Sequence, residues 1–448
     1  RIYKIRKNWE NLPPGPERDD FEKDYNEWPV EDGAPWVDVD GDGIYTKGVD
    51  QPQFVGDEVL WCVSNDMDPG RSTFTYGTLP MGLEQQMTVF GFNRTGDLGD
   101  MVFKKYLLIN KGSTTIRDMI LGYWSDTDLG GANDDYTGCD TVLSLGYTYN
   151  GEPTDDQFGS NPPADGYDFF QGPIVETGSL TDSAKFLGKW RKGWKNLPMT
   201  AFAFYINGSS IYQDPDLGTA EGSIQFYYYL QGKVWDGSEF VDPNTGQPTV
   251  FVLAGDPVAK TGWFEGDGWP GGPDPGDRRH LMSSGPFTMA PGDTQEVVVG
   301  ILIAQGSSAL NSVTELKRKD AAAQTAYDLD FNLTETPPAP KLHASTGDAQ
   351  VTLWWEDNAE SYDAGDPLIY GQGYDDTTYT FQGYRLWQFT DKAGSDPVLI
   401  GIWDVKDTVD IIYAYQDING EKVLVPAIKG PNEGIRRFKF LTSDAYTN

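Results

Sequence analysis

The stretch FTMAPGDTQEVVVGILIAQG, residues 287–306, combines a run of β-branched and aliphatic residues with a preceding turn. Valine, isoleucine and threonine favour extended chain because their branched side chains fit a pleated surface. Pro291-Gly292-Asp293 interrupts the run with residues that favour tight turns. The stretch therefore predicts two strands joined by a hairpin turn.

Other short runs share this composition. In TAFAFYING, residues 200–208, the side chains of Phe202, Phe204 and Ile206 alternate and so share one face of a predicted strand. Glycine (52) and proline (29) separate such runs along the chain. We therefore predict an all-β fold with a large β-sandwich-type amino-terminal domain. Further strand candidates are 104–111, 223–232 and 248–255.

One segment, SVTELKRKDAAAQTAYDLDF at 312–331, has helical rather than strand periodicity. Ser312 and Glu315 have the spacing of a capping box. Leu316 and Ala323 recur at helical intervals. We predict a single helix that closes the first domain.

A proline-rich segment, TETPPAPK at 334–341, follows this helix. Its prolines cannot continue a helix and favour an extended linker. The predicted organisation is a β-rich domain over residues 1–333, a linker over 334–341 and a second domain over 342–448.

The second domain begins with an alternating strand in which Val351, Leu353 and Trp355 share a face. With its proline-led first strand and the aromatic strand at 381–389, this segment resembles a fibronectin type III domain, which implies an immunoglobulin-like sandwich. It departs from that pattern because no tyrosine-rich strand pair follows 434–448. Either the chain is trimmed, or a neighbouring chain adds a strand to the open sheet edge.

The charge of the chain restricts its partners. Sixty-eight acidic residues against 34 basic ones give a formal charge of −34, which disfavours nucleic acid and anionic lipid surfaces. No apolar stretch of about 18 residues predicts a membrane span. The chain begins at Arg1 without an apolar leader, so we expect any targeting segment to have been removed or to lie outside this sequence.

The chain has two cysteines, Cys62 and Cys139. In an oxidising compartment they can pair, and closing a loop of this size would stabilise the fold by about 4 to 5 kcal/mol. The alternative is two buried free thiols.

An acidic loop, WVDVDGDGIYTKGVD, occupies residues 36–50. Three aspartates at alternate positions ahead of Gly43 match the start of an oxygen-ligand calcium loop. An EF-hand would next need a bidentate glutamate, but that position holds Val49 and the nearest acid comes one residue later. The loop is therefore either a non-EF-hand calcium site or a solvated turn. Its predicted ligands are the side chains of Asp38, Asp40, Asp42 and Asp50 and the carbonyl oxygen of Ile44.

A second acidic run, at 125–140, has no regular loop spacing, so calcium binding and a solvated loop are both open. Asp66 and Asp68 follow Cys62 closely. If the cysteines pair, all three acidic stretches cluster in space. The candidate ligands of the second run are Asp126, Asp128, Asp134, Asp135 and Asp140.

Few residue patterns support catalysis. His280 and His343 are the only histidines, and no Cys-x-x-Cys, nucleophile elbow or phosphate-binding glycine loop occurs. Two carboxylates suffice for glycoside hydrolysis, and acids lie beside tryptophans at 235–240 and 263–269. We expect no enzyme, with a glycoside hydrolase as the alternative.

A basic, aromatic segment, KFLGKWRKGWKN at 185–196, contrasts with the acidic chain. It can dock an acidic surface of a second copy or a glycan, or pair with acidic loops of its own chain. The candidate interaction patch is Lys189, Trp190, Arg191, Lys192 and Trp194.

Several longer segments resemble a family of large secreted proteins of unknown function. This family is usually exported by the type IX secretion system through a carboxy-terminal sorting domain, which this sequence lacks. The resemblance implies a secreted or cell-surface location and supplies no catalytic residues. It is carried by residues 28–50, 123–150, 162–173, 195–208 and 283–306.

Together these patterns predict a secreted or cell-surface, non-catalytic structural or adhesive protein stabilised by Ca²⁺. One alternative is a self-assembling subunit of an extracellular filament or surface layer. Another is a carbohydrate-binding or carbohydrate-active protein that uses its tryptophan-rich loops. The expected partners are therefore a second copy of the chain or surface glycans, without nucleic acid and without membrane insertion.

Overall fold

The computed structural model describes residues 1–93, 97–331, 337–365, 378–390, 396–409, 411–418 and 421–443. The chain divides into two compact units, Arg1–Phe331 and Asn332–Asn448. Antiparallel strands dominate both units, which confirms the all-β prediction. Residues 334–336 of the predicted linker lie outside the described residues. Within the described part of the chain, no helix is both long and apolar enough to cross a bilayer.

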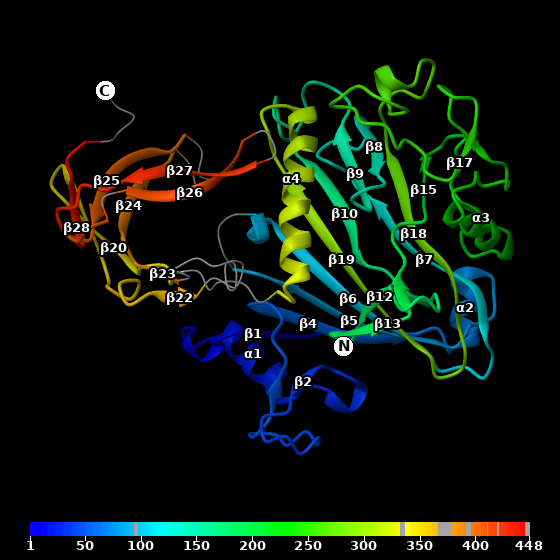
Figure 1. The fold of residues 1–448 in the computed structure, drawn as a ribbon, viewed down its shortest axis with the longest axis horizontal. Helices are drawn as coiled ribbons and strands as arrows, with labels where there is room; N and C mark the ends of the chain where they lie inside the picture. The colour runs from blue at the N-terminus through cyan, green and yellow to red at the C-terminus, as the bar shows by residue number, and fades with distance from the viewer. Residues whose placement is uncertain are drawn as a thin grey trace. The chain divides into compact units, whose positions relative to one another are not determined.

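The stretch at 294–304 forms β19, a central strand of an eight-stranded antiparallel sheet (Figure 1). Val297 and Val299 are buried on one face of this sheet, and Val298 and Leu302 are buried on the other. Because both faces are covered, the strand has a nearly continuous apolar sequence. In sheet order the strands are β1 (Tyr3–Arg6), β4 (Glu58–Asn65), β5 (Leu83–Gly91), β6 (Met101–Asn110), β19 (Thr294–Ala304), β10 (Ala164–Gln171), β9 (Leu145–Asn150) and β8 (Asp135–Asp140).

The predicted closing helix is α4 (Ala309–Asp328), which crosses one face of the large sheet (Figure 1). Leu316 and Ala323 are fully buried in the core that it shares with the sheet. The predicted start was wrong, because Ser308 caps the helix by accepting a hydrogen bond from the Asn311 amide. Ser312 instead lies inside the helix, where its hydroxyl donates to a backbone carbonyl.

A three-stranded sheet covers the opposite face. It consists of β15 (Ala201–Ile206), β18 (Arg278–Met289) and β7 (Ile116–Asp126), in that order. Phe202 and Phe204 of β15 are fully buried against the large sheet, in a core that also contains Val297 and Val299. Two stacked sheets with a helix on the outer face make this unit a β-sandwich.

The predicted hairpin at Pro291-Gly292-Asp293 was wrong in its pairing. The turn exists, since the Asp293 amide donates to the Ala290 carbonyl at 3.0 Å. However, β18 before the turn pairs with β15 and β7, whereas β19 after it pairs with β6 and β10. The turn therefore carries the chain from one sheet of the sandwich to the other.

The segment 223–232, predicted as a strand, lies mostly in helix α3 (Ala220–Leu230). Its aromatic run is continuous, so strand and helix periodicities could not be separated there. Thr219 decides the outcome, because its hydroxyl accepts a hydrogen bond from the Gly222 amide at the helix start. Tyr229 then packs, fully buried, against the three-stranded sheet.

The segment 248–255 is a strand only at Pro248–Thr249, named β17. Leu253 has a φ of 54°, which ends extended chain, and its side chain is buried in the sandwich core. The remaining elements of the first unit are α1 (Pro16–Asn26), α2 (Pro69–Tyr76), β2 (Trp36–Val37), β3 (Gln51–Pro52), β11 (Ile174–Glu176), β12 (Ser183–Phe186), β13 (Lys189–Lys192), β14 (Trp194–Asn196), β16 (Phe240–Val241) and the 3₁₀ turns η1 (Trp9–Asn11), η2 (Val30–Asp32), η3 (Asp97–Asp100) and η4 (Gly266–Gly268).

The second unit is also built from antiparallel strands. Trp355 on β21 is buried with Ala359 and Tyr384. The neighbouring Trp354 is 41% exposed, so the two tryptophans lie on opposite faces of the strand. Burial does not separate the faces earlier in the strand, where Val351, Thr352 and Leu353 are all half-buried. Its strands are β20 (Leu342–Gly347), β21 (Gln350–Trp355), β22 (Asp363–Gly365), β23 (Thr378–Thr380), β24 (Gly383–Gln388), β25 (Val398–Asp404), β26 (Ile411–Ile418), β27 (Glu421–Lys429) and β28 (Phe438–Leu441), the last pairing with β21.

Candidate metal loop and binding cavity

The loop between β2 and β3 brings three predicted metal ligands together. Carboxylate oxygens of Asp38, Asp40 and Asp42 all lie within 4.8 Å of one another on exposed side chains. Asp38 accepts hydrogen bonds from the amides of Gly41 (2.7 Å) and Gly43 (2.9 Å). Both glycines have φ of 77°, a left-handed conformation that lets the loop fold around these carboxylates.

Asp50 has a different role from the one predicted. Its carboxylate is buried and accepts hydrogen bonds from the amides of Val39 (2.8 Å) and Thr46 (2.6 Å). It is not part of the carboxylate cluster and instead holds the two arms of the loop together. Ile44 donates its amide to Asp42, and its side chain is 67% exposed.

The second acidic run contributes Asp126 and Asp128 to another cluster, with Asp277 as the third member. Sequence reasoning missed Asp277 because it is distant in the chain. Arg279 already lies among these carboxylates, 3.0 Å from Asp126 and 2.8 Å from Asp277. The guanidinium supplies the positive charge that a metal ion would otherwise bring, so this cluster is a weaker metal candidate than the loop at 38–42.

The other predicted ligands of the second run belong to neither cluster. Asp140 pairs with Lys317 at 3.0 Å. Asp135 is fully buried, and burial raises its pKa to about 8. One oxygen of Asp134 is buried without a hydrogen-bond partner among the described residues. The irregular spacing of the run therefore corresponds to side chains with separate roles.

The predicted disulfide is wrong, because both cysteines are free thiols. Cys62 lies on β4 and Cys139 on β8, at nearly opposite edges of the large sheet. Six inter-strand spacings of about 4.8 Å separate these strands, whereas a disulfide needs Cα atoms within about 7 Å. For the same reason the acidic residues that follow Cys62 lie far from Asp135 and Asp140 on β8. Asp66 instead accepts backbone hydrogen bonds at the start of β5.

The carboxylate pairs considered for glycoside hydrolysis are differently placed. Glu265 is buried and bound to Arg278 at 2.8 Å, so it is committed to an internal ion pair. His280 lies in the same interior and contacts the Thr137 hydroxyl at 3.2 Å. Burial lowers the pKa of His280 to about 3, so the imidazole is neutral at physiological pH. Asp236 is exposed and accepts hydrogen bonds from Ser238.

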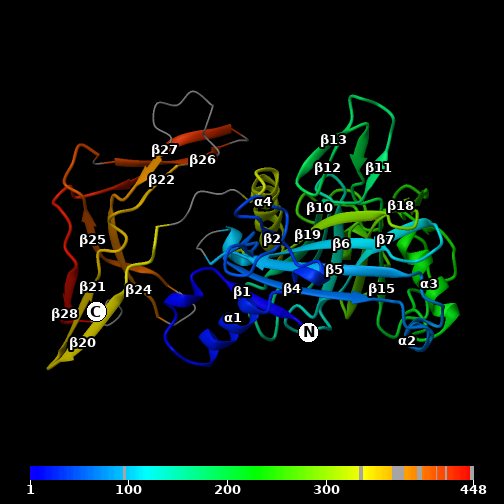
Figure 2. The ribbon, with the colours of Figure 1, turned by 90° about the horizontal axis from the view of Figure 1, so that it is seen from below.

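The predicted interaction patch lies mainly on a hairpin of β12 and β13 that projects from the large sheet (Figure 2). All four residues of β13 are exposed, and Trp190 is 68% exposed. Within the described residues, Lys189, Arg191 and Lys192 have no carboxylate within 4.0 Å, so they form no internal ion pair of the kind considered above. Trp194 is half-buried in a small apolar cluster and does not share the exposed surface.

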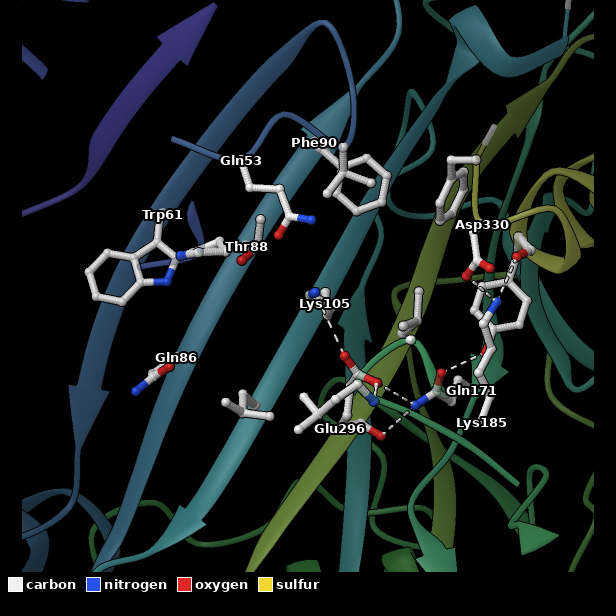
Figure 3. A pocket seen from close by; sticks show the side chains of 18 of the residues that line it. Gln53, Trp61, Gln86, Thr88, Phe90, Lys105, Gln171, Lys185, Glu296 and Asp330 are labelled. Carbon is white, nitrogen blue, oxygen red and sulfur yellow. Dashed lines mark hydrogen bonds and ion pairs between the residues drawn. The ribbon is translucent and has the colours of Figure 1, made fainter. Parts of the chain in front are cut away.

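Beside this hairpin, a cavity of about 520 Å³ lies over one face of the large sheet (Figure 3). One row of cross-strand neighbours forms its floor, running from β4 through β5, β6 and β19 to β10. The row places a hydroxyl, an ammonium group and an amide among apolar side chains. Its members, in order, are Trp61, Thr88, Lys105, Val298 and Gln171.

A network of hydrogen bonds fixes one wall of the cavity (Figure 3). Glu296 accepts from the Gln171 amide at 3.0 Å and from the Leu187 backbone amide at 2.7 Å. The Tyr327 hydroxyl donates to Gln171 at 2.6 Å. Lys185 donates to the Tyr327 carbonyl and pairs with Asp330 at 2.6 Å. This wall joins the end of α4, the sheet and the β12–β13 hairpin.

Sequence reasoning missed this cavity because its residues come from distant segments. A local signal existed, since Glu296 and Lys105 interrupt two otherwise apolar central strands. Charged side chains on a covered sheet face indicate either an internal network or a site. Which strands are neighbours, and hence that these residues meet, was not visible in the sequence.

No protein-family model matches the chain, and no curated protein is significantly similar to it.

Proposed function

We propose that this is a secreted or cell-surface protein with a non-catalytic structural or adhesive role, stabilised by Ca²⁺ at the loop containing Asp38, Asp40 and Asp42. The observation that carries the proposal is the gathering of their carboxylate oxygens within 4.8 Å. No lysine or arginine in the described residues lies within 4.0 Å of this cluster. Three such carboxylates repel one another unless a cation lies among them.

The chemistry of the loop favours calcium over other ions. Its ligands are all oxygens, and the protein offers neither the thiolates nor the paired imidazoles that zinc prefers. Magnesium demands stricter octahedral geometry and keeps more water than a carboxylate-rich loop of this kind supplies. Exposed calcium loops bind with Kd values of about 10⁻⁴ to 10⁻³ M, which suits an extracellular environment. The resemblance to type IX secretion substrates supports the same location.

The exposed hairpin favours self-assembly as a second candidate function. Among the described residues, no carboxylate lies within 4.0 Å of its exposed cations, Lys189, Arg191 and Lys192. The chain carries a formal charge of −34, so a second copy offers a complementary acidic surface. Negative-stain imaging of the purified protein would then show oligomers or filaments. A monodisperse monomer at high protein concentration and low salt would contradict this candidate.

Thermal melting with calcium and with a chelator tests the calcium proposal. For a Kd of about 10⁻⁴ M, calcium at a hundredfold excess stabilises the folded state by about 2.7 kcal/mol, a Tm shift of about 4 °C for the first unit. The test variant is Asp40→Asn/Asp42→Asn, which keeps the oxygens that accept the loop's backbone amides. Asp236→Asn is the matched control, because Asp236 is exposed in a similar turn outside either cluster. Equal calcium responses in all three proteins would refute the proposal.

A further inference from the structure

The cavity over the large sheet contains polar groups whose hydrogen-bonding capacity the described residues leave unused. The side-chain amide of Gln53 and the hydroxyl of Thr88 form no hydrogen bond with any described group (Figure 3). Gln86 donates through its nitrogen to Glu84 at 3.0 Å, but its oxygen accepts from no described donor. Lys105 lies 3.7 Å from Glu296, farther than a normal hydrogen bond. Donors and acceptors therefore line the same short stretch of cavity.

The charges in the cavity cancel. Lys105 faces Glu296, and Lys185 pairs with Asp330. Both anions thus have a cation beside them, and the cavity offers no net charge to a ligand. Because the whole chain has a formal charge of −34, long-range electrostatics also oppose an anionic ligand.

Apolar surface completes the cavity. Phe90, Leu107 and Phe331 line it between the polar groups. Trp190 is not among the residues that line the cavity, but it is the cross-strand partner of Lys185, whose side chain does line it. Directly opposed residues project from the same face of a hairpin, so the exposed Trp190 indole lies on the side that carries Lys185.

We propose that this cavity binds a short, neutral oligosaccharide, with Trp190 as a stacking surface beside its entrance. Each sugar hydroxyl both donates and accepts, which matches the mixed set at Gln53, Thr88 and Gln86. The apolar C–H faces of a sugar ring match the apolar walls and the indole. The volume of about 520 Å³ lies within the range of about 300 to 1,000 Å³ found for small-molecule sites. The proposal gives a ligand class to the adhesive role and rests on that role.

The test uses the full chain on an array of neutral and anionic oligosaccharides, followed by calorimetric titration with the strongest neutral binder. Two variants probe different parts of the site. Thr88→Val removes a hydroxyl at nearly constant shape, and Trp190→Ala removes an exposed ring, so neither should prevent folding. Each should weaken binding about tenfold, the loss expected for one hydrogen bond or one stacked ring. Phe74→Ala is the control for Trp190→Ala, since Phe74 is an 86% exposed ring that does not line the cavity.

Binding of a neutral oligosaccharide that both variants weaken, and that Phe74→Ala preserves, is the expected result. Absence of neutral binders, or binding of anionic glycans alone, would overturn the ligand class. Neutral binding that neither variant weakens would overturn the site. The effect of calcium on Tm is measured in a separate experiment. If calcium raises Tm but no glycan binds, this inference is overturned and the calcium proposal stands.

Discussion

A buried pair of carboxyl groups gives the sharpest prediction about stability. Asp168 on β10 and Asp320 on α4 are 0% and 1% exposed. Apart from each other, neither Asp168 nor Oδ1 of Asp320 has a hydrogen-bond partner among the described residues. Lys317, one turn earlier on α4, is committed to Asp140 and Asp256. Among the described residues, no cation therefore compensates the charge of the pair.

Burial raises the pKa of both groups, and for Asp320 it raises the pKa to about 7. Asp168 is raised further by the neighbouring charge of Asp320. A carboxyl group whose pKa is higher in the folded state binds more protons there than in the unfolded chain. Its contribution to stability is therefore present below the unfolded pKa of about 3.9 and is lost as the pH rises to about 7.

The substitution Asp320→Asn removes this loss while keeping the size of the side chain. Three pKa units at 1.36 kcal/mol each give an upper limit of about 4 kcal/mol. At pH 8 the variant should be more stable than the wild type by up to this amount. At pH 4 the two proteins should have nearly equal stability. The difference between the two proteins is the informative quantity. The lowered pKa of buried His280 reduces the stability of the folded state as the pH falls below about 6.5. This effect is the same in both proteins, so it cancels in that difference.

Urea unfolding followed by tryptophan fluorescence at pH 4, 6 and 8 measures this difference. Two compact units call for a fit with two transitions, and the prediction applies to the transition of the first unit. Asp328→Asn is the control, because Asp328 is an exposed carboxylate on the same helix. A variant that is less stable than the wild type at pH 8, or a difference that does not change with pH, would refute the reasoning.

Two further predictions concern the interior of the first unit. Thiol titration of the unfolded protein should give two free thiols under non-reducing conditions, since Cys62 and Cys139 are too far apart to pair. For the same reason a reductant should leave Tm unchanged. A value of zero thiols in monomeric protein would contradict the sheet order. Glu265→Gln should destabilise the first unit by about 3 to 5 kcal/mol in urea unfolding, because it leaves Arg278 buried without its partner carboxylate. A decrease in the free energy of unfolding of less than about 1 kcal/mol would show that the ion pair is not buried away from water as described.

The sequence was most informative where one local pattern dominates. The strand at 294–304 and the helix at 309–328 were predictable because composition and periodicity agree there. The hairpin prediction at 291–293 failed because a tight turn does not determine whether the strands on either side pair with each other. The aromatic run at 223–232 failed because it fits both periods, and the cap at Thr219 lies outside it.

The same limit applies to the candidate sites. Asp38, Asp40 and Asp42 were predictable because all three lie in one loop with regular spacing. The contribution of Asp277, the distance between the cysteines and the cavity floor all depend on strand order. That order is set by long-range packing, and no local pattern in this sequence records it. Sites within one loop could therefore be found from the sequence, and sites assembled across the sheet could not.

Calcium binding can be measured by calorimetric titration of calcium into the chelator-treated chain of residues 1–448. We expect saturable binding with a Kd of about 10⁻⁴ to 10⁻³ M that Asp40→Asn/Asp42→Asn abolishes and Asp236→Asn preserves. Absence of calcium binding in the wild type, or binding that the double substitution leaves unchanged, would contradict it.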